Sequence, residues 1–483
     1  MAKKKILTDN GKEILPITHE SCVLDNNGVS IGSKIGNINE LATDSRTDLV
    51  SAINDILEFK DSIKQENEET RNKLVELMQE GGYNITGEED IDSLLDLLSI
   101  SGIKLNCIKE ISCGGFFNGA TLTGITFILM NDGSLWGCGG NGNGQLGLGD
   151  TNNRTSFTQV TTNINNDVAR VFSGPFSTFI IKNDGSLWAC GYNALGNLGM
   201  GNTTTTYNTF TQVTTNINND VKYVDCRGQY ATFILKNDGS LWSCGMNGSG
   251  NLGLGDTNNR NTFTKVTTNI NNDVKQVACG LEHTFILKND GSIWSCGGNA
   301  YGELGLGDTN NRNTFTKVTT NINNDVKYVD LGYKHTCIFK IDGTIWSCGL
   351  NEFGQLGLNN TTAYKTFTKV TTNVSDVKQV VCGAYQIFML KNDGSLWACG
   401  HSVYGTLGIG LEGSGSYKAT FTKVTTNINN DVEEIHAAGL HVIILKNDNT
   451  LWGCGYNAQG CLGLGNTTTS YKTFNFIPRG LSY

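Results

Sequence analysis

The chain has 483 residues, of which 60 are glycine and 3 are proline, with 38% hydrophobic residues and a formal net charge of −9. This composition is too apolar for a disordered chain, and the acidic balance argues against the basic surface that nucleic-acid binding requires. No apolar run is long enough for a membrane span, and none of signal-peptide length follows the N-terminal lysines, so we expect neither segment.

Residues 1–43 come first and share nothing with the rest of the chain. Their central stretch, ITHESCVLDNNGVSIGSKI, reads as a short extended segment with a glycine-rich turn. We interpret residues 1–43 as an extended N-terminal attachment segment.

A helix is predicted from about Asp44 to Met78, within a stalk and connector that spans residues 44–104. Its apolar residues alternate at spacings of four and three, as in a short, imperfect heptad seam, and isoleucine at d positions favours more than two strands. We therefore expect a parallel coiled coil that forms a homo-oligomer, with a trimer favoured. Its contacts would be Leu49, Ile53, Ile56, Ile63, Asn67, Leu74 and Leu77. The alternative is an amphipathic helix that folds back on the rest of the chain.

Residues 105–483 consist of seven copies of one unit. All seven tryptophans lie in a motif of the form LWxCG or IWxCG, at intervals of 51–55 residues: Trp136, Trp188, Trp242, Trp294, Trp346, Trp397 and Trp452. A fixed period of this length indicates a propeller or a solenoid. Each unit contains four short apolar runs, and four strands make one propeller blade. The sequence therefore predicts seven four-stranded blades.

Turn and end signals predict how the strands connect. Asp-Gly precedes the tryptophan strand in six units, and Asp448-Asn449 in the seventh, which suits a type I′ hairpin turn. Each unit is taken to begin with its FTKV-like run. The first unit lacks that run, and the chain ends in a similar run, FNFIP (474–478). We expect this last strand to pair with the first blade and so close the ring.

The tryptophans are predicted to be core residues. Seven of the 15 cysteines occupy one repeated position, for example Cys138 and Cys296. Equivalent positions in separate blades lie too far apart for disulfides, so we interpret these cysteines as small buried side chains.

The full motif combines DG-S-L-W-x-C-G-x-N-x-x-G-x-L-G-x-G with a downstream G-x-x-H-T-F, as at Gly280–Phe285. It resembles the regulator-of-chromosome-condensation repeat family, over about residues 105–480. This resemblance implies an all-β fold, a seven-bladed β-propeller of four-stranded blades. The founding member's guanine-nucleotide exchange is not carried over, because it depends on insertions and basic surfaces that are particular to that protein.

The extended head, the helix and the large β domain also resemble tail or neck fibres of bacteriophages and phage-tail-like particles. This resemblance implies a non-enzymatic receptor-binding fibre located in the virion or particle. Its partners would be phage tail, baseplate or neck proteins at the N-terminus and a bacterial surface glycan or protein at the propeller. The alternatives are a neck or collar fibre without receptor binding, and an intracellular scaffold or GTPase-exchange-like regulator.

The chain carries none of the common catalytic or cofactor-binding signatures. It contains no P-loop, dinucleotide fingerprint, zinc-protease motif or nucleophile elbow, so we expect no enzyme, cofactor or metal. The most variable loops follow L-G-x-G and carry either an arginine or a tyrosine, which suits polar ligands as well as plain solvated loops. The candidate binding residues are Arg154, Arg260, Arg312, Tyr207, Tyr364, Tyr417 and Tyr471, with Phe116 and Phe117 from an insertion in the first unit.

Overall fold

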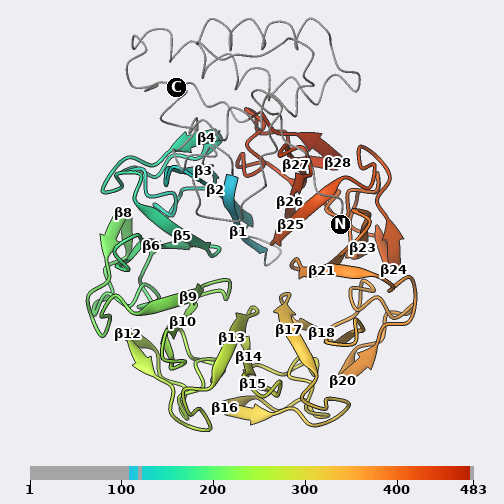
Figure 1. Ribbon diagram of the computed structural model, residues 1–483, viewed down its shortest axis with the longest axis horizontal. Helices are drawn as coiled ribbons and strands as arrows, with labels where there is room; N and C mark the ends of the chain where they lie inside the picture. The colour runs from blue at the N-terminus through green and yellow to red at the C-terminus, as the bar shows by residue number, and fades with distance from the viewer. Residues whose placement is uncertain (1–107, 118–121, 479–483) are drawn as a thin grey trace, which may run out of the picture. The chain divides into compact units, whose positions relative to one another are not determined.

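The computed structural model describes residues 108–117 and 122–478, which form seven four-stranded antiparallel sheets arranged in a ring (Figure 1). The predicted all-β seven-bladed propeller is confirmed. The attachment segment 1–43 and the stalk 44–104, with all the predicted oligomer contacts, lie outside the described residues. Within the described ranges, no helix is long and apolar enough to cross a membrane.

Each blade runs outward from the central channel in chain order. Blade one contains β1 (Ile108–Phe117), β2 (Leu122–Met130), β3 (Leu135–Gly139) and β4 (Arg154–Gln159). Blades two and three contain β5 (Val168–Ser173), β6 (Ser177–Lys182), β7 (Leu187–Tyr192), β8 (Thr206–Gln212), β9 (Val221–Asp225), β10 (Ala231–Lys236), β11 (Leu241–Gly245) and β12 (Arg260–Lys265).

The remaining blades repeat this order. Blades four and five contain β13 (Val274–Cys279), β14 (His283–Lys288), β15 (Ile293–Gly297), β16 (Arg312–Lys317), β17 (Val326–Leu331), β18 (His335–Lys340), β19 (Ile345–Gly349) and β20 (Tyr364–Lys369). Blades six and seven contain β21 (Val377–Cys382), β22 (Gln386–Lys391), β23 (Leu396–His401), β24 (Tyr417–Lys423), β25 (Val432–Ala438), β26 (His441–Lys446), β27 (Leu451–Tyr456) and β28 (Ser470–Phe476).

The predicted ring closure is wrong in its strand pairing. The FTKV-like run is the outermost strand of the blade before it, so the units are offset by one strand from those read in the sequence. The last strand, β28, pairs with β27 of its own blade, with Trp452 opposite Phe476. Consecutive strands with short connections pair with each other first, which gives each blade four contiguous strands.

Blade seven meets blade one through the same kind of contacts as the other seams. The Thr126 hydroxyl donates to the Cys461 carbonyl at 2.7 Å, as Thr178 does to Gln145 across the next seam at 2.8 Å. The backbone of Gly465 donates to Thr155 on β4 at 2.9 Å. The ring is therefore closed by interlocking loops and side chains.

The hairpin turns also differ from the prediction. In blade one the Gly133 N–H donates to the Met130 carbonyl at 3.0 Å, and Met130 N–H donates to Ser134 at 2.9 Å. Gly133 has a φ of +82°, and Asp132 is not among the residues with positive φ. This is a three-residue loop that ends in a left-handed glycine, and not a two-residue type I′ turn. Asn449 takes that conformation in blade seven, with a φ of +68°.

The prediction that the tryptophans are core residues is also wrong. Each tryptophan is only partly buried, and in six blades a lysine amine lies 4.0–4.7 Å from its ring centre. The fully buried rings are phenylalanines on the second and fourth strands, such as Phe285 and Phe315. The tryptophan strand pairs on both sides, but one face of its ring lies under the lysine near the blade surface.

The motif cysteines are buried and unpaired, as predicted. All 13 cysteines of the described ranges are free thiols, and burial raises the pKa of Cys454 well above its usual range. The Cys190 thiol lies 3.4 Å from the Gln145 carbonyl of the preceding blade. Each motif cysteine thus fills a blade seam.

Candidate functional site

The three predicted arginines lie at the outer rim, each at the start of the outermost strand of its blade. Arg154 pairs with Asp150 at 2.7 Å, and Arg260 and Arg312 pair with the aspartates four residues earlier at 2.6 Å. The arginine also donates to a carbonyl inside its loop. Each arginine therefore stabilises its own DTNNR loop.

The predicted tyrosines occupy the same position in other blades. The Tyr207, Tyr364 and Tyr471 hydroxyls bond to the side chains of Asn202, Asn360 and Asn466 at 3.0–3.2 Å. Arginine thus accompanies aspartate and tyrosine accompanies asparagine, which explains the two loop types. Tyr417 is 45% exposed, in the one loop that has neither pattern.

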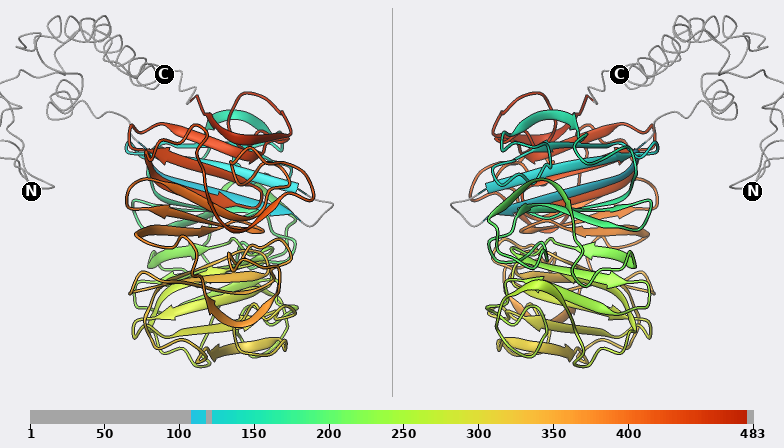
Figure 2. Two further views of the ribbon diagram at one scale, coloured as in Figure 1. Left: turned by 90° about the vertical axis from the view of Figure 1, so that its right-hand side faces the viewer. Right: turned by 90° about the vertical axis from the view of Figure 1, so that its left-hand side faces the viewer.

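Phe116 and Phe117 lie away from the rim, at the end of β1 beside the channel. The edge-on views show the β1–β2 hairpin, in cyan, reaching one face of the ring (Figure 2). Phe116 is buried against Phe176 of blade two at 5.2 Å and Tyr333 of blade five at 5.9 Å. The Phe117 N–H donates to the Tyr333 hydroxyl, so the hairpin joins opposite sides of the ring.

These residues belong to a larger group of rings, which we call the aromatic belt. Its members come from blades one, two, three, five and six and contact each other at centroid distances of 4.0–6.5 Å. They are Phe116, Phe117, Phe176, Tyr192, Tyr230, Tyr333, Phe353, Tyr385 and His401. Tilted, edge-on and offset contacts of this kind are the arrangements that aromatic pairs favour. The belt covers this end of the channel with apolar surface.

Aromatic residues extend outward from the belt in three consecutive blades. The loop after the third strand carries Tyr301, Phe353 and Tyr404 at the second x of its N-x-x-G motif in blades four, five and six, with Ser402 replacing the asparagine in blade six. Tyr301 is 38% exposed, and the Lys334 amine lies 5.0 Å from its ring. The other blades have Asn143, Leu195, Ser249 and Gln459 at this position. The fold therefore accepts a polar residue there.

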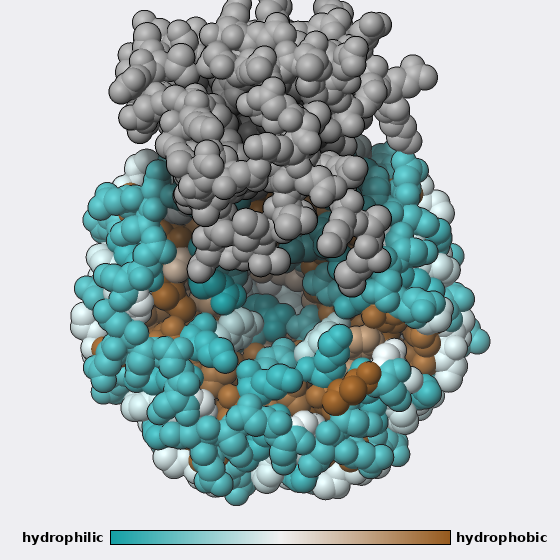
Figure 3. Space-filling view, in the orientation of Figure 1, coloured by the Kyte–Doolittle hydropathy of each residue, from teal (hydrophilic) through white to brown (hydrophobic). Residues whose placement is uncertain are grey.

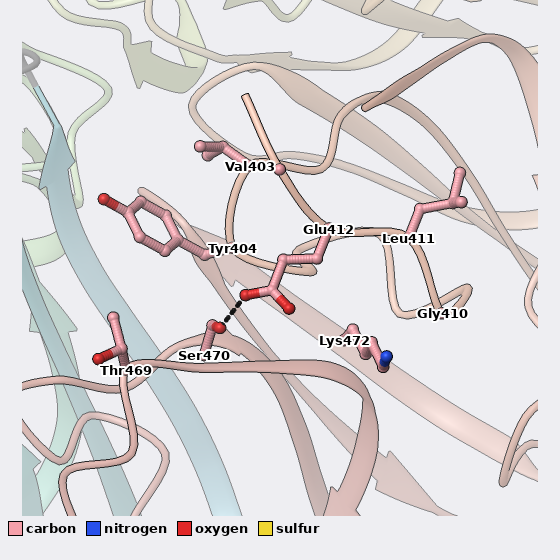
Figure 4. Close-up of a pocket in the computed structure, with 9 residues that line it drawn as sticks. Val403, Tyr404, Gly410, Leu411, Glu412, Thr469, Ser470 and Lys472 are labelled. Atoms are coloured by element: carbon pink, nitrogen blue, oxygen red, sulfur yellow. Dashed lines mark hydrogen bonds between the residues drawn. The ribbon is translucent and has the colours of Figure 1, made fainter. Parts of the chain in front are cut away.

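A pocket of about 650 Å³ lies where this aromatic arc reaches the seam of blades six and seven. The irregular loop after β23 forms one wall, with Leu411 and Glu412, and β28 supplies Ser470 and Lys472. Figure 4 shows the Glu412 carboxylate directed toward the Ser470 hydroxyl, with Tyr404 on one side and Lys472 on the other. The pocket presents apolar, hydroxyl and charged groups together.

The central channel is crossed by a partly buried ion triad. Arg227 binds Asp225 at 2.8 Å and reaches Asp330 of blade five at 2.6 Å. Burial opposes its charge, but the two carboxylates raise the pKa of Arg227 well above its usual range. A cavity of about 460 Å³ lies beyond it, and the centre of the ring is hollow in Figure 3. The triad is a structural crosslink between blades.

Polar side chains in the cavity wall satisfy the free edges of the inner strands. Gln276 donates to the Val329 carbonyl at 2.8 Å and accepts from its N–H at 3.1 Å, and Gln379 makes the same pair of contacts with Ile435. Asp330 accepts from the Cys382 N–H at 2.8 Å. Unpaired strand edges are otherwise free to associate. These residues are engaged within the fold.

The three repeat histidines are buried at the seams. The Nε2 atom of His283 lies 3.1 Å from the Thr336 hydroxyl, and that of His441 lies 3.1 Å from Thr126. Burial lowers the pKa of His283 to about 3 and the pKa values of His335 and His441 to about 4. The histidines are therefore neutral structural groups at physiological pH.

The structure does not bring the sequence-predicted residues into one site. Seven lie one per blade around the outer rim, and only Phe116 and Phe117 join the belt. The sequence-based prediction missed the other belt residues. It also missed Tyr301, Phe353 and Tyr404, although the aromatic second x of N-x-x-G in three consecutive blades was a readable signal. No group of three metal-ligating side chains is found in residues 108–117 and 122–478.

Family models match most of the ring. The RCC1-like domain model matches residues 226–480, and regulator of chromosome condensation (RCC1) repeat models match residues 132–181 and 108–145. The first of these covers more than half of the chain.

Relatives and a solved structure agree with these models. The ultraviolet-B receptor UVR8 of Arabidopsis thaliana is 27% identical over 68% of this chain and 74% of the receptor. The secretion-regulating guanine nucleotide exchange factor of Bos taurus is 27% identical over 48% of this chain and 52% of that protein. The crystal structure of Prp20p from Saccharomyces cerevisiae has a TM-score of 0.64 at 18% identity, over 78% of this chain and 88% of that one. At this identity the likeness shows the fold alone.

These comparisons overturn the fibre hypothesis. The three proteins are cellular proteins of a plant, a mammal and a yeast, and two are named as a receptor and an exchange factor. The predicted phage fibre and the virion location are therefore wrong. The predicted partners, a trimer joining phage tail, baseplate or neck proteins to the bacterial surface, are wrong for the same reason. The regulator alternative agrees better with these relatives.

Proposed function

Because the chain belongs to the RCC1-like domain family, we propose that it is a non-enzymatic regulatory scaffold that binds a partner protein through the face carrying the aromatic belt. The arc of Tyr301, Phe353 and Tyr404 is the observation that carries this proposal. Three neighbouring blades place a large ring where the fold accepts asparagine or serine. Aromatic residues are enriched at the centres of protein interfaces.

The surroundings of the arc support the same proposal. The belt beneath it is held by ring contacts from five blades, so the rings are preorganised and little side-chain entropy would be lost on binding. The pocket beside Tyr404 adds Glu412 and Lys472 as charged groups at its edge. An apolar centre with a polar margin is the usual anatomy of an interface.

A second candidate function is GTPase-exchange-like regulation. It is favoured by the 27% identity to the secretion-regulating guanine nucleotide exchange factor, which covers about half of each chain. Faster release of a fluorescent guanine nucleotide from a small GTPase in the presence of this protein would support it. In that case the partner at the aromatic face would be the GTPase.

The residues predicted from the sequence as binding contacts have a place in this proposal. We propose that Phe117, at the edge of the belt, contributes to the partner contact, and that Arg154, Arg260, Arg312 and the rim tyrosines are secondary contacts. We also propose that the chain divides into an attachment segment at residues 1–43, a helical stalk and connector at residues 44–104 and a propeller at residues 105–483.

The proposal is tested by a triple variant, Tyr301→Ser, Phe353→Ser and Tyr404→Ser. We expect it to fold, because Ser249 occupies the same position in blade three. Affinity purification from the host cells, followed by titration of the identified partner, should show at least a tenfold loss of affinity, as expected for removing interface aromatics. Ile341→Ser is the control, because Ile341 is 71% exposed in a β18–β19 turn, away from these loops. Equal affinity of the triple variant and the control would contradict the proposal.

A further inference from the structure

Every inner strand of the propeller contains a β-bulge near its start. In blade four Val274 pairs with Lys288 and Gln276 pairs with Leu287, so Lys275 has no partner residue on β14. The same shift occurs in all seven blades. The extra residues are Lys109, Ala169, Lys222, Lys275, Lys327, Lys378 and Glu433. Bulges redirect side chains and are enriched beside functional sites.

The bulge side chains border the mouth of the 460 Å³ cavity. Lys222, Lys275, Lys327 and Lys378 are exposed, and in each case the next residue lines the cavity. This mouth lies at the start of the inner strands, whereas Phe116 and Phe117 lie at the end of β1. Figure 3 shows mainly hydrophilic side chains around the hollow centre of the ring. Four consecutive blades therefore present a lysine at one end of the channel.

In blades three to five, the carboxylates that precede the bulges are already engaged with other lysines. Asp220, Asp273 and Asp325 precede the bulges and pair at 2.9–3.1 Å with the buried lysines that lie over the tryptophans. Lys222 and Lys275 form no ion pair within residues 108–117 and 122–478. Lys378 pairs with Glu433 at 2.7 Å, where both side chains are solvent-exposed and the pair is weak. The four lysines Lys222, Lys275, Lys327 and Lys378 therefore carry surplus positive charge.

This surplus is local. Residues 108–478 contain 24 Lys and Arg against 25 Asp and Glu, so the ring as a whole is nearly neutral. Blade seven has Glu433 and Glu434 where blades three to six have lysine and a neutral side chain. The run of consecutive bulge lysines is thus limited to blades three to six and ends at an acidic blade.

We propose that Lys222, Lys275, Lys327 and Lys378 bind a short acidic segment of a partner protein at the channel mouth. Lysine is a flexible point charge that can follow carboxylates spaced along an extended peptide. Glu433 and Glu434 end the run of lysines after four blades. A positive run of this limited length matches a short acidic segment better than a continuous phosphate backbone.

The test is binding of fluorescein-labelled decaglutamate to the full chain at about 50 mM NaCl, where exposed charges are weakly screened. The variant is Lys222→Gln, Lys275→Gln and Lys327→Gln, which the bulge tolerates because Ala169 occupies it in blade two. The matched control is Lys265→Gln, Lys317→Gln and Lys369→Gln, three exposed lysines at the end of outer strands. We expect about a tenfold loss of affinity in the variant, as three surface charge contacts imply, and a change below about twofold in the control.

Three results would overturn the inference. These are an equal loss in both triple variants, no binding of decaglutamate by the wild type, and tighter binding of decathymidylate that the same variant abolishes. The last result would mean that the bulge lysines bind nucleic acid. The aromatic-face variant should bind decaglutamate normally, so a failure of one proposal is distinguishable from a failure of the other.

Discussion

Replacing Phe315 with alanine is expected to lower the free energy of unfolding by about 3–5 kcal/mol, the usual cost of deleting a fully buried ring. Phe315 is 0% exposed on the outer strand of blade four, and it packs in the seam against the glycine loop of blade three, beside Gly253. The ring fits closely against that loop, so we expect the cavity left by its removal not to collapse easily. The loss should appear as a lower midpoint in urea unfolding.

Trp294→Ala in the same blade is the matched comparison. Trp294 is partly buried, donates to Ser292 at 3.1 Å and lies 4.6 Å from the Lys288 amine. Its removal leaves Lys288 paired with Asp273 at 2.9 Å, so we expect a cost of about 2 kcal/mol. A larger loss from Trp294→Ala than from Phe315→Ala would mean that the tryptophan strand, and not the seam, holds the core.

Acidification from pH 7 to pH 5 is expected to destabilise the propeller by about 2 kcal/mol for each repeat histidine. His283, His335 and His441 are at most 1% exposed, and burial lowers their pKa values to about 3–4, whereas unfolded histidine titrates near 6.5. Below pH 6.5 the unfolded chain therefore binds protons that the folded chain does not. The contribution of the buried, neutral histidines to stability is therefore fully present above pH 6.5 and is lost as the pH falls toward 4.

Replacing all three histidines with glutamine isolates this effect. Gln386 occupies the equivalent position in blade six, so the fold accepts glutamine there. The difference in unfolding free energy between pH 7 and pH 5 should be several kcal/mol smaller in the variant, because the carboxylates are the same in both proteins. Urea titrations at the two pH values measure it. An identical pH dependence would show that the histidines are charged or accessible in the native state.

The period of the tryptophans was enough to predict the number of blades and strands. It could not define which strand starts a blade, because a repeat has no marked beginning and FTKV can be read before or after its neighbours. The offset became clear only from the pairing of β28 with β27. Asp-Gly likewise predicted a hairpin but not the length of its loop, since both turn types place glycine at positive φ.

The aromatic belt could not be predicted in the same way. Phe116 and Tyr333 are more than 200 residues apart and belong to blades one and five, so their contact depends on ring closure. The tryptophans were predicted to be core residues, but in six blades the lysine six residues earlier, on the preceding strand, covers the ring only once the hairpin forms. The fibre hypothesis depended on residues 1–104, whose pattern resembles many helical connectors.

The central claim, that the aromatic face binds a partner protein, is tested most directly by site-specific photo-crosslinking. A photoreactive phenylalanine analogue would replace Tyr301 in one variant of this chain and Ile341 in a second variant. The two side chains are exposed at 38% and 71%, respectively. We predict a crosslinked partner from position 301 and none from position 341. The same partner captured from position 341, with none from position 301, would contradict the account.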